Sequence, residues 1–337
     1  MYKPTYKITP YLLNLIDEIS SLRAWIERAT IKVSWLPTLQ KEAHSKTAHS
    51  STAIEGNPLS LHQVKAIARG DKVGAHIDHE REVTNYLKAI KWLKKNMSER
   101  ITENKLLALH QVLSAGLLPE EKSGKYKQKQ NYVLNERKIK IYTPPSSKAS
   151  PQLVKELLIW LSTKEAKDLH PVLVCAVVHH RLVSIHPFSD GNGRLSRALG
   201  TWILYQRGFD TQHIFSLDEF FASNRKMYYL KLQQARDLDD NLTHWIEHVA
   251  EGILHTLKDV KKRIEDLHVS SKSCINLTPR QEDLLRILRD HPHMRVAGLQ
   301  KELKLTRARI NQLIMPLVDC GLVIKEGRSK ATHYRLA

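Results

Sequence analysis

Apolar residues recur three and four positions apart over most of this chain, and no other feature constrains its fold as strongly. Leu12, Ile16 and Ile19 show the spacing in the first such segment. Because an α-helix has 3.6 residues per turn, this spacing places the apolar side chains on one face and predicts amphipathic helices. We expect helices at 11–35, 38–55, 82–97, 104–116, 151–161, 171–182, 194–207, 224–236 and 241–267. The chain is therefore predicted to be mainly α.

The stretch from residue 132 to residue 141 has the alternating pattern of strands in place of the helical spacing. Tyr132 and Leu134 alternate with polar residues on one side of a polar turn at 135–138, and Ile139 and Ile141 alternate on the other side. Alternation with a period of two is typical of strands that bury one face. The stretch predicts a β-hairpin within the helical body.

The helical periodicity stops at residues 268–276, where serines and a lysine replace the apolar positions. This composition predicts a linker. Three helices are then expected at 279–289, 296–303 and 307–318, followed by two strands that end near Leu336. That order is typical of a winged helix-turn-helix, although Pro316 falls inside the third helix and predicts a bend.

These patterns divide the chain into parts, as its 337 residues allow for two or three domains. We expect an N-terminal helical region (1–100), a helical core with the hairpin (101–267), the linker (268–276) and the winged helix-turn-helix (277–337).

The composition narrows the class of protein. Hydrophobic residues make up 42% and charged residues 26%, which is typical of globular chains and excludes a disordered one. No apolar run of about 18 residues occurs, and the first residues lack the apolar core of a signal peptide. We therefore expect a cytoplasmic protein with no membrane partner. Cys175, Cys274 and Cys320 form no CxxC pair, which argues against a disulfide framework or a cysteine zinc site.

The charge is strongly positive, with 53 Lys plus Arg against 35 Asp plus Glu and a net charge of +18. Such a field attracts phosphates, nucleic acid and acidic proteins, and it also serves solubility alone. Residues 277–337 hold 12 Lys plus Arg against 6 Asp plus Glu.

DNA is a candidate partner of the C-terminal part. Its third predicted helix carries, in its first turns, side chains that can reach base edges or phosphates in a major groove: Arg307, Arg309, Asn311 and Gln312. Lys325, Arg328 and Lys330 would lie on the wing. Winged helices also serve as dimerisation or protein-docking domains, and that alternative stays open.

The strongest chemical signal is the stretch from His186 to Arg197, which reads HPFSDGNGRLSR and lies between two helical segments. Gly191 and Gly193 flank Asn192 and allow the backbone to come close to a ligand. The amides that begin the next helix point outward at the positive end of the helix dipole. The turn is therefore a candidate anion cradle.

The neighbouring side chains suit a nucleotide. Arg194 and Arg197 are three positions apart and project from one helix face toward the same phosphates. Asp190 precedes the cradle, where a carboxylate can hold the Mg²⁺ that bridges phosphates. His186 is then the candidate base for a phosphoryl or nucleotidyl transfer.

These residues resemble a known family, because HPFSDGNGRLSR matches the Fic signature HPFx(D/E)GNGRxxR at every specified position. The resemblance implies a Fic helical bundle and the transfer of AMP from ATP to a serine, threonine or tyrosine hydroxyl of a target protein. His186 would be the general base and Asp190 the magnesium ligand. It also implies that residues 191–193 form the anion hole and that Arg194 and Arg197 bind the β- and γ-phosphates.

The resemblance extends to residues outside this stretch. Phe188 would anchor the loop in the core. The hairpin would be the flap that aligns a target segment by strand addition, with Pro144 and Pro145 closing it. The alternative is a plain edge hairpin that does not align a target.

One further segment follows the family less closely. Asn224, Tyr228 and Tyr229 resemble its adenine-side helix, although core packing explains adjacent tyrosines as well.

UMP and phosphocholine transfer are weaker alternatives to AMP transfer. His179 and His180 have no metal-ligand spacing, and we expect them to pack in the core.

The segment Ser51–Gly56 ends a predicted helix at about 41–56. Glu55 lies near the negative end of that helix dipole, so a cationic partner is expected. The segment also resembles the inhibitory helix (S/T)xxxE(G/N) of Fic proteins. This implies that Glu55 pairs with Arg197 and blocks productive placement of the γ-phosphate.

Alternatives remain for the activity. Glu55 could instead orient a water that removes AMP from a modified protein, which would make the enzyme a de-AMPylase or bifunctional. A second class is a DNA-binding regulator whose Fic body senses nucleotide, but a sensor would not require His186. Homo-oligomerisation is a further candidate, because an interface could relieve the inhibition.

Overall fold

The computed structural model describes residues 2–29, 36–134, 139–209, 213–271, 277–319, 322–327 and 332–336. The chain forms two compact units. The first is built from Met1–Ala29 and Leu39–Val260, and the second from Thr30–Thr38 and Lys261–Ala337.

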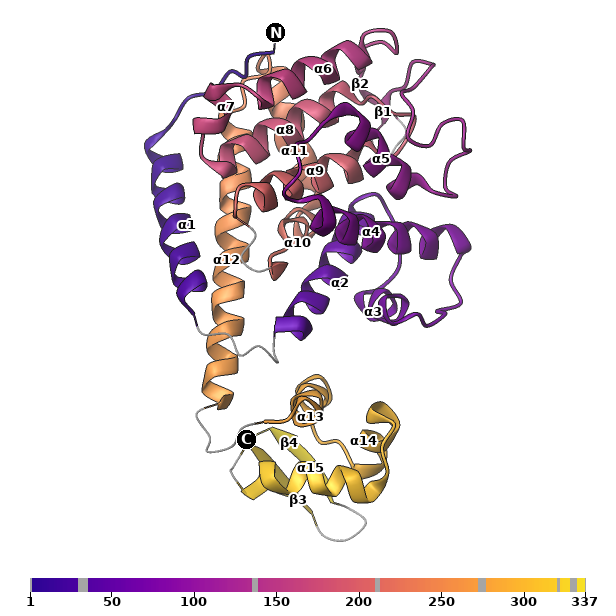
Figure 1. Cartoon of the computed structure of the whole chain (residues 1–337), viewed down its shortest axis with the longest axis vertical. Helices are drawn as coiled ribbons and strands as arrows, with labels where there is room; N and C mark the ends of the chain where they lie inside the picture. The colour runs from indigo at the N-terminus through magenta and orange to yellow at the C-terminus, as the bar shows by residue number, and fades with distance from the viewer. Residues whose placement is uncertain are drawn as a thin grey trace. The chain divides into compact units, whose positions relative to one another are not determined.

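The described residues are mainly helical, as predicted, with two small antiparallel sheets (Figure 1). In chain order the elements are α1 (Pro10–Arg28), α2 (Leu36–Ile54), α3 (Leu61–Arg69), α4 (Ile77–Asn96), α5 (Glu103–Ser114), β1 (Val133–Leu134), β2 (Lys140–Tyr142), α6 (Ser150–Leu161), α7 (Lys164–Asp168), α8 (Pro171–Ile185), α9 (Asn192–Gln206), α10 (Leu217–Ser223), α11 (Arg225–Asp237), α12 (Thr243–Ser271), α13 (Pro279–Asp290), α14 (Val296–Leu303), α15 (Arg307–Asp319), β3 (Val323–Glu326) and β4 (His333–Leu336).

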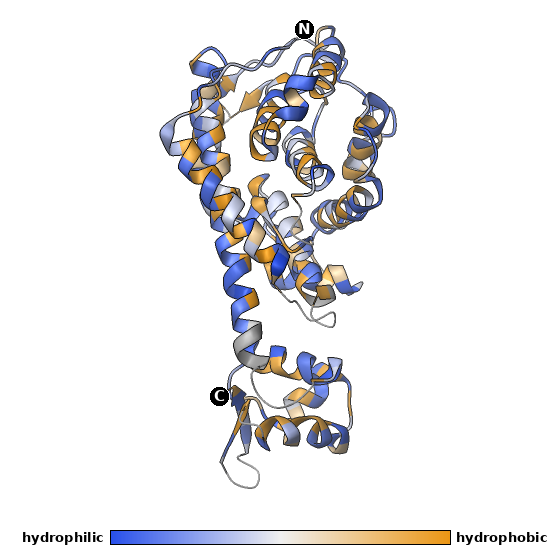
Figure 2. Ribbon diagram, turned by 60° about the vertical axis from the view of Figure 1, so that its left-hand side comes forward, coloured by the Kyte–Doolittle hydropathy of each residue, from blue (hydrophilic) through white to orange (hydrophobic). Residues whose placement is uncertain are grey.

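α8 and α9 form the centre of the first unit, and α4, α5 and α6 pack around them (Figure 1). Every residue of α8 from Val172 to Ile185 is buried except Arg181. A helix that is apolar on all sides belongs in a core, whereas the surrounding helices bury only one face. Figure 2 shows hydrophobic and hydrophilic residues mixed along these outer helices, as the amphipathic spacing predicts. The central pair holds the stretch that carries the chemical signal.

The first helix is shorter than predicted. α1 ends at Arg28 because Ala29 adopts an extended backbone, with φ −63° and ψ 127°. The rest of the predicted helix, residues 30–35, lies outside the described residues.

The predicted start of the linker is wrong by four residues, because α12 continues to Ser271. Serine lowers helix propensity only modestly, so a pair of serines does not by itself end a helix. Residues 272–276 of the predicted linker lie outside the described residues.

Three short helices, α3, α7 and α10, were missed by the periodicity. They have 9, 5 and 7 residues, and a reliable helical period needs roughly 11 to 18. A local signal did mark α3, since Ser60 and Gln63 form a capping box at its start.

The predicted hairpin forms. β1 pairs antiparallel with β2, with Val133 opposite Tyr142. Its turn at 135–138 lies outside the described residues.

The second unit has three helices and a two-stranded sheet in the predicted order. Leu284, Leu299, Ile310 and Val323 are among the residues of its own buried apolar cluster. α15 continues through Pro316 to Asp319. The winged helix-turn-helix classification remains a prediction, and Arg328 and Lys330 lie outside the described residues.

Two composition-based expectations can be compared with the described residues. None of their helices is both long and apolar enough to cross a membrane. Cys175 is a free cysteine buried in α8, where burial raises the pKa of its thiol to about 12. Cys274 and Cys320 lie outside the described residues.

Candidate active site

The central loop owes its shape to two left-handed residues. His186 ends α8 with φ 50°, and its amide donates to the Leu182 carbonyl. Gly191 begins α9 with φ 79°, a conformation that glycine adopts without steric cost. The chain therefore reverses between the C-terminus of α8 and the N-terminus of α9, which brings His186 close to the free amides of α9.

The side chain of Asn192 closes the loop, while the predicted anion hole at residues 191–193 stays a prediction. Its Oδ1 accepts from the Phe188 amide and its Nδ2 donates to the Phe188 carbonyl, each at 2.9 Å, and the residue is buried. Both polar ends are used to close the loop. Only the backbone of Asn192, in the first turn of α9, remains available to an anion.

Phe188 lies in the core, as expected of an anchor. It is fully buried and stacks on His110 of α5 with ring centroids 3.8 Å apart. The Gly124 amide donates to His110 Nδ1, so His110 Nε2 carries the proton and donates to the Asp190 carbonyl at 2.9 Å. His110 thus holds both the anchor and the loop. No local pattern marks this role, because Phe188 and Asp190 lie about 80 residues along the chain from His110.

A second support comes from the segment before the hairpin. The Lys127 amide donates to the Pro187 carbonyl at 2.8 Å, and Asn131 Nδ2 donates to the Phe188 carbonyl at 2.8 Å. Lys127 Nζ in turn donates to Asn131 Oδ1 at 2.7 Å. Burial lowers the pKa of Lys127 to about 8. Neither residue belongs to a motif or a periodic pattern that would mark this role in the sequence.

His186 has the tautomer that a base requires. Its Nδ1 lies 3.2 Å from the Val183 carbonyl, which can only accept, so Nδ1 carries the proton and Nε2 keeps its lone pair. Burial lowers the pKa of His186 to about 4, and the positive charges of Lys127 and Arg236 act in the same direction. The imidazole is therefore neutral near pH 7 and able to accept a proton at Nε2.

Arg194 is held by two carboxylates. Its Nη1 lies 2.7 Å from Glu82 Oε1 and its Nη2 2.9 Å from Asp190 Oδ2. Nε of Arg194 is buried and has no hydrogen-bond partner among the described residues. A buried donor without an acceptor is costly to the fold. Glu82, which lies on α4, was not anticipated.

Arg197 is completely buried and is bound by α2. Its Nε donates to Ser51 Oγ at 2.7 Å and its Nη2 to the Ser51 carbonyl at 2.8 Å. Nη2 also lies 2.7 Å from Glu55 Oε1, which is the predicted pairing. Burial opposes the charge, but the carboxylates of Glu55 and Asp218 contribute to holding the pKa of Arg197 well above its ordinary value.

Glu55 also lies against the candidate anion cradle. A Cβ atom on Gly193 would overlap Glu55 Oε1, so glycine is required there while this carboxylate is in place. Gly193 belongs to the first turn of α9, where free amides favour a negative group. The carboxylate therefore lies beside the position where a phosphate would meet both the helix terminus and Arg197.

Asn224 and Tyr229 contact neighbouring backbone. Asn224 Oδ1 accepts from the Met227 amide and caps α11. The Tyr229 hydroxyl donates to the Ile54 carbonyl at 3.3 Å, at the end of α2. The predicted role of Tyr229 at the adenine remains a prediction.

Tyr228 is buried beneath Arg197. Its hydroxyl lies 3.5 Å from Arg197 Nη1 and 3.0 Å from His179 Nε2. His179 and His180 are buried, and burial lowers the pKa of His180 to about 3. The two histidines pack in the core as predicted, while the placement of Tyr228 indicates that it supports Arg197.

Asp190 fits the predicted magnesium site. Its side chain is 63% exposed, and its Oδ2 contacts Arg194. Magnesium binds proteins through one or two carboxylates and completes its coordination with phosphates and waters. A single exposed aspartate beside an anion cradle matches this donor set.

The predicted DNA-contacting residues are exposed at the start of one helix of the second unit. Arg307, Arg309, Asn311 and Gln312 are all exposed on the first turns of α15. Arg309 Nη1 donates to Gln312 Oε1 at 2.9 Å.

Comparisons with known proteins point to one family. Residues 100–204 match the model of the Fic/DOC family. "Protein adenylyltransferase Fic" of Aedes aegypti is 32% identical over 209 residues, covering 60% of this chain and 39% of that protein. The protein of the same name from Nematostella vectensis is 32% identical over 204 residues, covering 59% of this chain and 45% of that protein. The chain thus spans less than half the length of these relatives.

Solved structures agree with this comparison. A Fic family protein from Desulfovibrio desulfuricans G20 superposes with a TM-score of 0.73 at 26% identity, covering 100% of this chain and 98% of that one. Residues 134–508 of Fic-1 from C. elegans give a TM-score of 0.65 at 23% identity, covering 75% of this chain and 73% of that one, and show the shared fold.

Proposed function

Since residues 100–204 form a Fic domain, we propose that this protein is an adenylyltransferase that moves AMP from ATP to a serine, threonine or tyrosine hydroxyl of a target protein. The observation that carries the proposal is the tautomer of His186. A neutral imidazole with its Nε2 lone pair available stands beside a helix N-terminus and two arginines. A nucleotide sensor needs the phosphate ligands but not the base.

In this proposal His186 Nε2 removes the proton from the target hydroxyl. The hydroxyl oxygen attacks the α-phosphorus of ATP, the bond from that phosphorus to the bridging oxygen breaks, and pyrophosphate leaves. The amides of Gly191 to Gly193 stabilise the negative charge that develops on the phosphate oxygens. Arg194 and Arg197 bind the β- and γ-phosphates.

Asp190 would hold Mg²⁺, which supplies positive charge to the phosphates when it is bound. Asp190 also orients Arg194 through their contact at 2.9 Å. The loop that carries Asp190 is fixed independently by His110, so the carboxylate needs no large rearrangement to act.

The hairpin would align the target segment. Four apolar side chains of the hairpin region are exposed to solvent, because the two-stranded sheet does not cover them. Their exposed fractions are 51% for Tyr132, 51% for Leu134, 56% for Ile139 and 40% for Ile141. An extended segment of the target could add to a strand edge and cover part of this surface.

Glu55 would inhibit the transfer, because its carboxylate holds Arg197 and lies against the first turn of α9. The same carboxylate could orient a water for AMP removal. Release of AMP from a modified partner, lost in Glu55→Gly, would favour removal over addition.

DNA binding by the second unit is a second candidate function. The exposed polar residues at the start of α15 favour it over an apolar docking role. A salt-dependent shift of duplex DNA by the full chain would support this function, and no shift at low salt would leave protein docking. For the protein as a whole, we propose a cytoplasmic location.

The proposal is tested by labelling with two forms of ATP. Glu55→Gly protein with Mg²⁺ should retain label from α-³²P-ATP and none from γ-³²P-ATP, since AMP and not phosphate is transferred. Adding His186→Ala should abolish the α-label. Glu42→Gly is the control, because it introduces glycine into α2, the helix that precedes Glu55, at a residue away from Arg197. Label from the γ-phosphate, or α-label that survives His186→Ala, would contradict the mechanism.

A further inference from the structure

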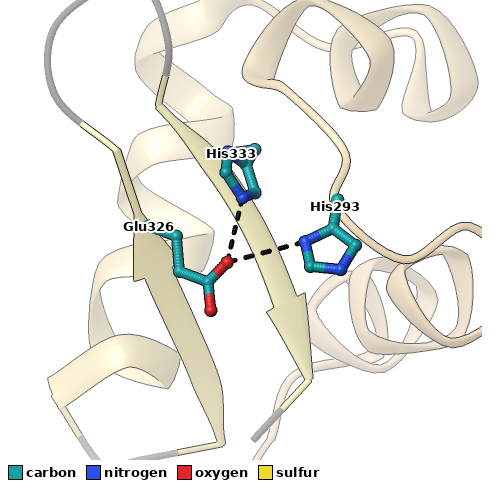
Figure 3. A group of neighbouring side chains, drawn as sticks. All are labelled: His293, Glu326 and His333. Carbon is teal, nitrogen blue, oxygen red and sulfur yellow. Dashed lines mark hydrogen bonds and ion pairs between the residues drawn. The ribbon is translucent and has the colours of Figure 1, made fainter.

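Three side chains of the second unit converge at one place that the proposed chemistry does not use. His293 precedes α14, Glu326 ends β3 and His333 begins β4 (Figure 3). His333 Nε2 lies 2.9 Å from Glu326 Oε2, and His293 Nδ1 lies 3.5 Å from the same oxygen. The three potential ligand atoms all lie within 4.8 Å of one another.

Backbone pairing brings these residues together. Glu326 and His333 are direct partners across the β3–β4 sheet. Met294 exchanges two backbone hydrogen bonds with Tyr334, at 3.0 and 2.8 Å, which sets His293 beside His333. The cluster is therefore assembled by the fold and not by chance contact of long side chains.

The backbone of His293 adds an independent observation. It has φ 65°, in the left-handed region that residues other than glycine seldom adopt. Such outliers persist only where the surrounding structure maintains them, and they gather at ligand sites. Here the unusual conformation accompanies a side chain directed at Glu326 (Figure 3).

The distances suit a small transition metal ion. Ligands bound tetrahedrally at about 2.0 to 2.1 Å lie roughly 3.3 Å from one another. The two distances to Glu326 Oε2, 2.9 and 3.5 Å, lie on either side of this value. Two imidazoles and a carboxylate favour zinc(II) over magnesium, which prefers oxygen ligands alone.

The second oxygen of Glu326 is oriented by a neighbour. Arg335 Nε donates to Glu326 Oε1 at 2.6 Å, which leaves Oε2 toward the imidazoles. Outer contacts of this kind orient the ligands of known metal sites.

We propose that His293, Glu326 and His333 bind one zinc(II) ion and leave a fourth position for water or another donor. The ion joins the segment before α14 to both strands of the sheet. Zinc binding therefore stabilises the β3–β4 hairpin. The competing explanation is that both histidines are protonated and form ion pairs with Glu326, which needs no metal.

The test is a calorimetric titration of zinc chloride into the full chain at pH 7.5, after dialysis against a chelator. We expect one strong site per chain. His333→Asn and Glu326→Gln should each weaken it at least tenfold, whereas His291→Asn should not. His291 is the matched control, because it is exposed in the same loop and lies outside the cluster.

A second measurement tests the site in the unmodified protein, in case a variant fails to fold. Nitrogen-15 NMR of the histidine rings in the unmodified protein should show His293 Nδ1 and His333 Nε2 shifting with one equivalent of zinc. The site is refuted if these resonances do not move, or if folded His333→Asn binds zinc as tightly as the unmodified chain. An equal loss in His291→Asn would also overturn it.

Discussion

Replacing Glu55 should release the proposed inhibition by an amount that its contact with Arg197 sets. The Arg197 side chain is completely buried, and Nη2 donates to Glu55 Oε1 at 2.7 Å. A hydrogen bond between charged groups contributes about 1.5–3 kcal/mol. Arg197 keeps its two bonds to Ser51, so the loss should not much exceed this range.

The free energy of the Glu55–Arg197 contact sets the expected increase in the labelling rate. Each 1.4 kcal/mol is about tenfold, so Glu55→Gly should raise the initial rate of α-³²P labelling by roughly 10- to 150-fold at limiting ATP. Glu55→Gln keeps a hydrogen bond from the charged Arg197 but loses the attraction between opposite charges, so it should raise the labelling rate by less than Glu55→Gly. The order glycine above glutamine above wild type is the sharper part of the prediction.

The same contact stabilises the fold, so activation and stability should move in opposite directions. Glu55→Gly should lower Tm by a few degrees in a thermal melt. Glu42→Gly should also lower Tm without raising the labelling rate. A labelling rate within twofold of wild type for Glu55→Gly, or equal activation by Glu42→Gly, would refute the inhibitory role of the Glu55 carboxylate.

Further predictions follow from other contacts. Because the pKa of His186 is about 4, kcat/KM for labelling should be flat from pH 8 to 5.5, and an acid limb near 6.5 would contradict the effect of burial. Folding lowers the pKa of His110 from 6.5 to about 4. Neutral His110 therefore adds about 3 kcal/mol to the free energy of unfolding above pH 6.5, and this contribution is lost as the pH falls toward 4. Urea unfolding of His110→Asn should depend less on pH between 6.5 and 4 than that of wild type. Ser51→Ala removes a hydrogen bond to the buried Arg197 and should lower the free energy of unfolding by about 1.5–3 kcal/mol, with no change in a urea titration arguing against the contact. If DNA binds, Arg309→Ala should reduce the slope of log K against log salt by about 1 in a fluorescence titration, and an unchanged slope would exclude a phosphate contact.

Much of the fold could be predicted from local patterns. The periodicity located most of the long helices, and alternation located the hairpin, because both depend on neighbours within a few residues. Short elements such as α3, and the true end of α12, were beyond this method. Their limits depend on caps and on packing more than on the apolar period.

The sequence by itself determined the chemistry of the central loop, because HPFSDGNGRLSR holds the base, the glycines and the arginines within twelve residues. Those parts are joined by one turn between two helices, so short-range geometry is enough to bring them together. The local sequence also suggested Glu55 as a partner for an arginine, through its place at a helix end.

Only the tertiary structure decided how those parts are held. The side chain of Asn192 closes the loop on Phe188, a contact that its place between two glycines did not indicate. His110 reaches Asp190 from 80 residues away, and Glu82 reaches Arg194 from another helix. Such contacts join residues that share no period or motif. They arise from the packing of α4 and α5 around α8 and α9, which no local pattern contains.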